Sequence, residues 1–150
     1  MKNTYIIGEI GQNHNGSVDL AKLIIELISR PVHEDVFGMD FMPMNAVKMT
    51  KRDLSEELAV SQMNQIYDNP NSFGRTYGEH RAFLELSDEE HYEVYKYAKE
   101  KGLDFVETLC AKGCMSLLKL FTPDYLKVAS RDLTNLPLLE VMAETEIPII

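Results

Sequence analysis

The sequence predicts an α/β fold of the TIM-type (β/α)8 barrel class, with about the first four βα units and the start of strand 5. Short apolar runs alternate with helical patterns, which is typical of a parallel sheet. The last three runs begin at Asp104, Tyr125 and Ile147, and this even spacing favours a barrel over a doubly wound sheet. No Gly-x-Gly-x-x-Gly follows the first run, which disfavours a dinucleotide-binding fold.

The first βα unit is the clearest in the pattern. The apolar run over residues 5–10 predicts a buried strand, and residues 11–16 form a polar turn. Ser17 is a good N-cap for the helix that follows, and Pro31 ends that helix. Its predicted apolar face carries Leu20, Ile24, Leu27 and Ile28.

The second unit has a long connection. Residues 45–50 predict a strand, with Val47 and Met49 alternating around Lys48. Residues 51–86 are polar and lack clear periodicity, which is typical of a functional or mobile segment. A capping-box signature at residues 87–90 then opens a helix that runs to about residue 101.

The remaining pattern is regular. Residues 103–109 predict the third strand and residues 114–121 the helix after it. Residues 125–129 predict the fourth strand, and Asn135 caps the next helix, which has Pro137 in its first turn. Residues 147–150 begin a fifth strand.

A complete barrel takes roughly 250 residues. Residues 1–150 would therefore form the N-terminal half of one domain, with strand edges left unpaired. We expect a truncated reading frame, a fragment or a chain that needs a partner half.

Composition excludes several classes of function. With 45% hydrophobic and 26% charged residues, the chain is typical of a soluble globular protein. It has no apolar stretch of the roughly 20 residues that a membrane span needs and no secretory signal, so no membrane role and a cytoplasmic location are expected. The net charge of −9 disfavours nucleic acid but permits a small anionic substrate. Cys110 and Cys114 are interpreted as free, packed thiols, because no second Cys or His pair accompanies them at a zinc spacing.

Each predicted strand brings polar side chains to its carboxyl end, where barrel active sites lie. They are Glu9 at the end of strand 1 with Asn13 and His14 after it, Lys48 on strand 2 with Lys51 and Arg52 just beyond, Glu107 and Thr108 at the end of strand 3, and Lys127 on strand 4 with Ser130 and Asp132 at its end. Two lysines, a serine and a threonine suit a phosphate. The three carboxylates could balance the lysines, order a sugar hydroxyl or move a proton.

Structural interpretations stay open for several of these residues. Lys48 and Lys127 could pair with Glu9 and Asp132 as a structural network. Glu107 could be a strand end with its charge in solvent. In the same way, His14 could only brace the tight turn beside Gly16. Four methionines are interpreted as core residues that fill gaps: Met39, Met42, Met44 and Met49.

Several motifs, in this order along the chain, resemble those of the N-acetylneuraminate (sialic acid) synthase family. Ile7-Gly-Glu-Ile-Gly-Gln-Asn-His-Asn-Gly16 resembles the opening motif, and Ala46-Val-Lys48 the second-strand lysine motif. Leu86-Ser-Asp-Glu-Glu-His91 resembles the start of the second helix, and residues 125–139 resemble the fourth-strand motif with its helix.

The resemblance implies a condensation of phosphoenolpyruvate with an N-acetylmannosamine-type amino sugar to a nine-carbon sialic acid, with release of phosphate. It also implies a divalent metal (Mn²⁺ or Mg²⁺) that polarises the sugar aldehyde, and a homodimer when the enzyme is complete. The family's metal-binding histidines and its C-terminal antifreeze-like domain have no counterpart in these 150 residues, so we expect no metal ligand here and no activity of this chain alone.

The resemblance also assigns roles residue by residue. Lys48, Lys127 and Ser130 would hold phosphoenolpyruvate, with Thr108 as a weaker candidate. Glu9 and Asp132 would be the catalytic acidic residues, and Asn13 and His14 would shape the first loop. Arg131 stands where the family usually has Gly, and Thr50 where it often has Gln, which suggests a divergent branch with a different sugar.

Two other functions remain as alternatives. One is another phosphoenolpyruvate-dependent aldol synthase or a generic aldolase of the barrel class. The other is a non-catalytic remnant that binds a partner or a phosphorylated ligand.

Overall fold

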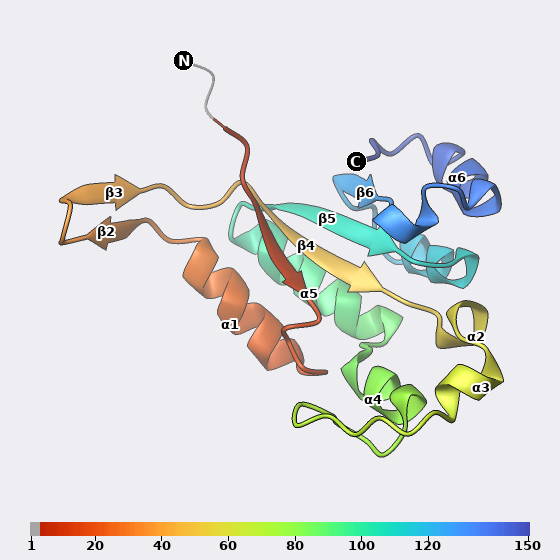
Figure 1. Ribbon diagram of the computed structural model, residues 1–150. Coiled ribbons are helices and arrows are strands. Elements are labelled where there is room, and N and C mark those ends of the chain that lie inside the picture. Colours follow the sequence, from red (N-terminus) through yellow and green to blue (C-terminus); the bar gives the residue numbers. More distant parts are fainter. Residues whose placement is uncertain (1–3) are drawn as a thin grey trace.

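A parallel sheet with helices packed against it forms the centre of the computed structural model, which describes residues 4–150 (Figure 1). The strands β1, β4, β5 and β6 pair in that order, and all three pairings are parallel. The elements along the chain are β1 (Ile7–Gly11), α1 (Val18–Ile28), β2 (Val32–Glu34), β3 (Met39–Phe41), β4 (Ala46–Lys51), α2 (Leu54–Glu57), α3 (Val60–Met63), α4 (Tyr77–Leu84), α5 (Asp88–Glu100), β5 (Asp104–Leu109), the 3₁₀ helix η1 (Lys112–Lys119), β6 (Tyr125–Lys127), the 3₁₀ turn η2 (Ser130–Asp132) and α6 (Leu136–Ala143).

The sheet follows from the apolar runs predicted by the sequence. Both faces of β5 are covered, and from Phe105 onward every residue of the strand is buried, as is usual for a parallel strand between two layers. Each strand neighbours the next sheet strand along the chain, because a helical connection returns the chain to the same edge each time. The predicted α/β fold with a parallel sheet is confirmed.

Helices α1 and α5 lie side by side against one face of the sheet (Figure 1). Both begin at a serine whose hydroxyl accepts a backbone N–H, Ser17 from Leu20 and Ser87 from Glu90. Ser87 is part of a complete capping box, as the sequence predicted. The buried side of α5 includes Val94 and Ala98, which meet the sheet.

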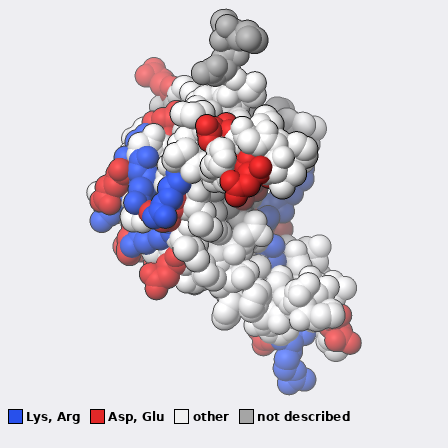
Figure 2. All heavy atoms as spheres, turned by 90° about the vertical axis from the view of Figure 1, so that its left-hand side faces the viewer, with Lys and Arg blue, Asp and Glu red and all other residues white. Residues whose placement is uncertain are grey.

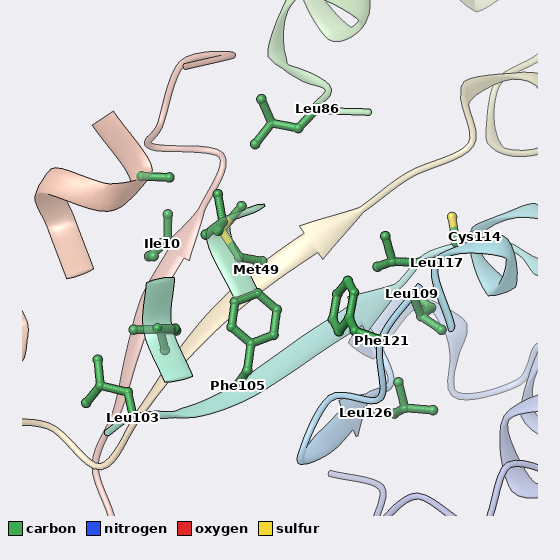
Figure 3. Close-up of a cluster of buried hydrophobic side chains, with 14 of the residues drawn as sticks. Ile10, Met49, Leu86, Leu103, Phe105, Leu109, Cys114, Leu117, Phe121 and Leu126 are labelled. Atoms are coloured by element: carbon green, nitrogen blue, oxygen red, sulfur yellow. The ribbon is translucent and has the colours of Figure 1, made fainter. Parts of the chain in front are cut away.

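The hydrophobic core lies between the sheet and these helices (Figure 3). Phe105 is fully buried and makes edge-to-face contacts with Tyr95 and Phe121, at ring-centroid distances of 5.5 and 5.8 Å. Ile10 and Met49 extend the same cluster along β1 and β4 (Figure 3). Aromatic pairs in this geometry add to the stability gained from burial alone.

The segment between α1 and β4 contains two short strands that the sequence did not predict. It folds into the antiparallel hairpin β2–β3, whose residues Val36 and Phe37 are 81% and 78% exposed. Met39 and Met42 on this hairpin segment are also exposed, so their interpretation as core residues was wrong, while Met49 is buried as predicted.

On the side of the molecule drawn in Figure 2, acidic and basic side chains are interspersed.

The boundaries of several other elements also differ from the predictions. Residues 51–86 contain three helices, of which α2 and α3 have four residues each and bury no apolar residue, so they produce no apolar period. Residues 114–121 lie mostly in a 3₁₀ helix that already begins at Lys112. The fourth strand ends at Lys127. Residues 147–150 form no full strand, but they lie parallel to β6 through a bridge between Leu126 and Ile149 and its flanking backbone hydrogen bonds.

Phe105→Ala tests this description of the core. Removing a fully buried aromatic ring should lower the free energy of unfolding by about 3–5 kcal/mol, measured by urea denaturation. Phe37→Ala is the matched control, since its ring is 78% exposed, and should change stability by less than about 0.5 kcal/mol. Equal losses in the two variants would contradict the assignment of the core.

Candidate functional site

A row of polar side chains crosses the parallel sheet near its carboxyl edge. The strand register places Glu9 beside Lys48, Thr50 beside Thr108, and Thr108 beside Lys127. Because the strands are parallel, their carboxyl ends meet at one edge. Four of the residues proposed from sequence are therefore close neighbours: Glu9, Lys48, Thr108 and Lys127.

Lys48 is the centre of this row. Its ammonium group forms an ion pair with the Glu9 carboxylate and donates a hydrogen bond to the Thr108 hydroxyl at 3.3 Å. The Lys48 side chain is only 12% exposed, whereas Glu9 is 52% exposed. A charge with so little access to water needs such partners. The predicted contact between Lys48 and Glu9 is therefore confirmed. The same contact orients the ammonium group.

Lys127 differs from Lys48 in its partners. Its ammonium donates to the Val128 carbonyl at 3.1 Å, and no carboxylate within residues 4–150 forms an ion pair with it. The predicted network between Lys127 and Asp132 was wrong, because the Asp132 carboxylate meets Arg131 instead. The positive charge of Lys127 is thus the less neutralised of the two.

Glu107 lies on the opposite face of β5 from Thr108, because successive residues of a strand point to opposite sides. It is fully buried, and its carboxylate meets His91 of α5 at 3.0 Å. Two of the interpretations of Glu107, a solvent-exposed strand end and a partner of the lysines, were therefore wrong. His91 Nε2 and Glu107 Oε1 are buried without a hydrogen-bond partner, so this pair lies inside the sheet–helix layer.

Ser130 and Asp132 form the short turn η2 that follows β6. Ser130 is exposed, and Asp132 is 9% exposed. Between them, Arg131 reaches to Glu57 of α2 and to the Asp132 carboxylate at 3.4 Å. A cavity of about 410 Å³ opens beside this turn and is lined by Glu56, Glu57, Cys110, Ala111, Lys112, Arg131, Asp132 and Asn135.

Asn13 and His14 lie in the turn between β1 and α1. Asn13 is exposed, while His14 is 1% exposed and its Nδ1 accepts the Gly16 N–H at 3.1 Å. Gly16 has φ +71°, and a Cβ there would stand 2.2 Å from the Phe83 carbonyl oxygen of α4. The turn is therefore tightly packed against α4, and His14 braces it.

The protonation state of His14 follows from this packing. Burial, together with the neighbouring His91, lowers the pKa of His14 to about 4. The imidazole is therefore neutral at neutral pH, which Nδ1 requires in order to accept the Gly16 N–H.

The two cysteines are free and buried, as predicted. Burial raises the pKa of both thiols, that of Cys114 to about 12. Since the thiolate is the reactive form, neither cysteine is a candidate nucleophile.

Within the part of the chain from Thr4 onward, no three His, Cys, Asp or Glu side chains are grouped so that they could hold a metal ion. The metal implied by the resemblance has no matching set of ligands there. In the same residues, no helix has both the length and the apolar character to cross a membrane.

Sequence reasoning missed Glu57 and His91, and it named Arg52 without a partner. Glu57 lies in the segment without periodicity, and nothing local marks it, since its partner Arg131 is 74 residues away. His91 was named only as part of a helix motif, although a histidine on the inner face of an amphipathic helix could have been noticed.

Chemically, the row of Glu9, Lys48, Thr108 and Lys127 offers an anion two lysines and a hydroxyl beside one half-exposed carboxylate.

Comparison with known proteins gives consistent results. The sequence model of the NeuB family matches residues 42–150. The chain is 31% identical over 147 residues to N-acetylneuraminate-9-phosphate synthase of Drosophila melanogaster and 32% identical over 146 residues to the protein of that name from Homo sapiens. Each match covers 97% of this chain but only 36% and 38% of those proteins.

A solved structure supports the fold. The N-acetylneuraminic acid (sialic acid) synthetase of Leptospira borgpetersenii serovar Hardjo-bovis, in complex with citrate, aligns with a TM-score of 0.71 at 23% identity. The alignment covers 99% of this chain and 44% of that one. The chain thus spans less than half the length of these relatives.

The buried His14 predicts acid sensitivity. Its pKa is about 4 in the folded chain and near 6.5 in the unfolded chain, so the unfolded state binds more protons between these values. The contribution of neutral His14 to the free energy of unfolding should be fully present above pH 6.5. The free energy of unfolding should fall by about 1–3 kcal/mol as the pH drops to 4, measured by urea titration. His14→Asn keeps an acceptor for the Gly16 N–H without titrating, so its pH dependence should be shallower. If the free energy of unfolding of that variant depends on pH as steeply as that of the unaltered chain, other groups cause the effect.

Proposed function

We propose, because this chain belongs to the NeuB family, that it supplies the phosphoenolpyruvate side of a sialic acid synthase-type active site. Residues 1–150 would be the N-terminal half of the (β/α)8 barrel that carries this site. The observation that carries the proposal is the row of Lys48, Thr108 and Lys127 beside Glu9 at the carboxyl edge of the sheet.

The two lysines fit the two anionic groups of phosphoenolpyruvate. Lys48 is held in one orientation by Glu9 and Thr108, so its ammonium is preorganised before the ligand binds. Lys127 has no carboxylate partner within residues 4–150 and can give its charge to the phosphate or carboxylate of the ligand. Ser130 and Thr108 would add hydroxyl hydrogen bonds to the same groups.

The proposed reaction is the condensation of phosphoenolpyruvate with an N-acetylmannosamine-type sugar. C3 of phosphoenolpyruvate forms a bond to the sugar aldehyde carbon, whose oxygen takes up a proton. Water adds at C2 and gives up a proton, and phosphate then leaves. Glu9 is half exposed at the end of the row and could accept or return one of these protons, with Asp132 as the second acidic residue. No step is assigned to a metal, because the described residues hold no set of three ligands.

Lys127→Ala tests the proposal, because it should weaken phosphoenolpyruvate binding about 10- to 100-fold through the loss of one charge-assisted hydrogen bond. Isothermal titration calorimetry of the 150-residue chain at constant ionic strength gives the Kd, and urea denaturation gives the stability, which should change little.

Lys119→Ala is the matched control, since Lys119 is an exposed lysine of η1 away from the row. It removes the same net charge and should leave the Kd within about twofold. A Lys127 variant that loses stability and affinity in parallel would favour a structural role for this lysine and would contradict the proposal.

A further inference from the structure

Glu57 is an almost fully buried carboxylate at the carboxyl edge of the sheet. Its side chain is only 5% exposed, although it belongs to a one-turn helix on the surface. One oxygen accepts the Asp53 backbone N–H at 3.2 Å. The other accepts Arg52 Nη1 at 2.9 Å and also meets Arg131 Nη2. A carboxylate removed from water in this way is stable only while these cations remain in place.

Arg131 connects this carboxylate to the proposed site. It follows Ser130 directly, and its Nε reaches the Asp132 carboxylate while Nη2 reaches Glu57. The turn that carries these residues has no side-chain cap of its own and follows a strand of only three residues. Within residues 4–150, the side-chain hydrogen bond that links this turn to another element is the one from Arg131 to Glu57.

We propose that Glu57 is a positioning residue, which acts through Arg131 to hold Ser130 and Asp132 in place at the phosphoenolpyruvate site. The inference rests on the proposed function, because it needs a ligand at that site. Glu57 itself touches no reacting atom. It fixes the Arg131 guanidinium, and the guanidinium fixes the turn.

A purely electrostatic role for Arg131 would give different results. Glu57→Gln frees the Arg131 charge and should then strengthen the binding of an anion, whereas Arg131→Gln removes the charge and should weaken it. Positioning predicts the same sign in both variants, because either change releases the turn. An electrostatic role therefore changes the affinity in opposite directions in the two variants, whereas a positioning role lowers it in both.

The experiment measures phosphoenolpyruvate binding to the 150-residue chain by calorimetry. Glu57→Gln and Arg131→Gln should each weaken binding about tenfold, and the double variant should be no weaker than either single one, because both act through one contact. The Ser130 amide resonance should shift with ligand in the unaltered chain and shift less in the variants. Arg30→Gln, which breaks an exposed ion pair with Glu26, is the matched control and should change the Kd by less than about twofold.

Three outcomes would overturn the inference: opposite signs for the single variants, multiplied effects in the double variant, or loss of affinity only in proportion to loss of stability by urea denaturation. An unaltered chain that fails to bind phosphoenolpyruvate would instead overturn the proposed function, and the positioning role would fall with it.

Discussion

Because β1, β4, β5 and β6 pair in parallel and in chain order, their carboxyl ends all reach one edge of the sheet. Side chains that lie 60 or more residues apart in the sequence thereby become neighbours, as Lys48 and Thr108 do at 3.3 Å. The helical connections, the buried apolar layer beneath the sheet and the polar row above it all depend on this pairing. A slip of one residue in the register of one strand would turn that strand's member of the row toward the helices.

The alternation of side chains along each strand also separates two kinds of buried charge. Thr108 faces Lys48 on one side of β5, while Glu107, its immediate neighbour, faces His91 on the other. A pair within the sheet–helix layer is closed to a ligand, whereas the row ends in the half-exposed Glu9. The proposed chemistry therefore rests on the row, which a ligand can reach at Glu9, and not on the enclosed His91–Glu107 pair.

The sequence predicted the parts of the fold that depend on long apolar periods, and these are the parallel strands, α1 and α5. It missed the hairpin β2–β3, whose apolar side chains are largely exposed and so follow no burial pattern. Helices α2 and α3 were missed because single turns that bury no apolar residue leave no period. Helix α4 could have been found, since Thr76 and Glu79 form a complete capping box at its start.

The polar row could be predicted because each member is marked by its own strand, but the partner of a charge is set by the tertiary structure. Glu107 and Asp132 were both matched to lysines from their sequence positions, and the structure gives them His91 and Arg131. Arg131 had been notable only as a departure from the family pattern. Its contact with the buried Glu57 neutralises it, so the positive charge available to an anion at this edge still comes mainly from Lys127 and the oriented Lys48.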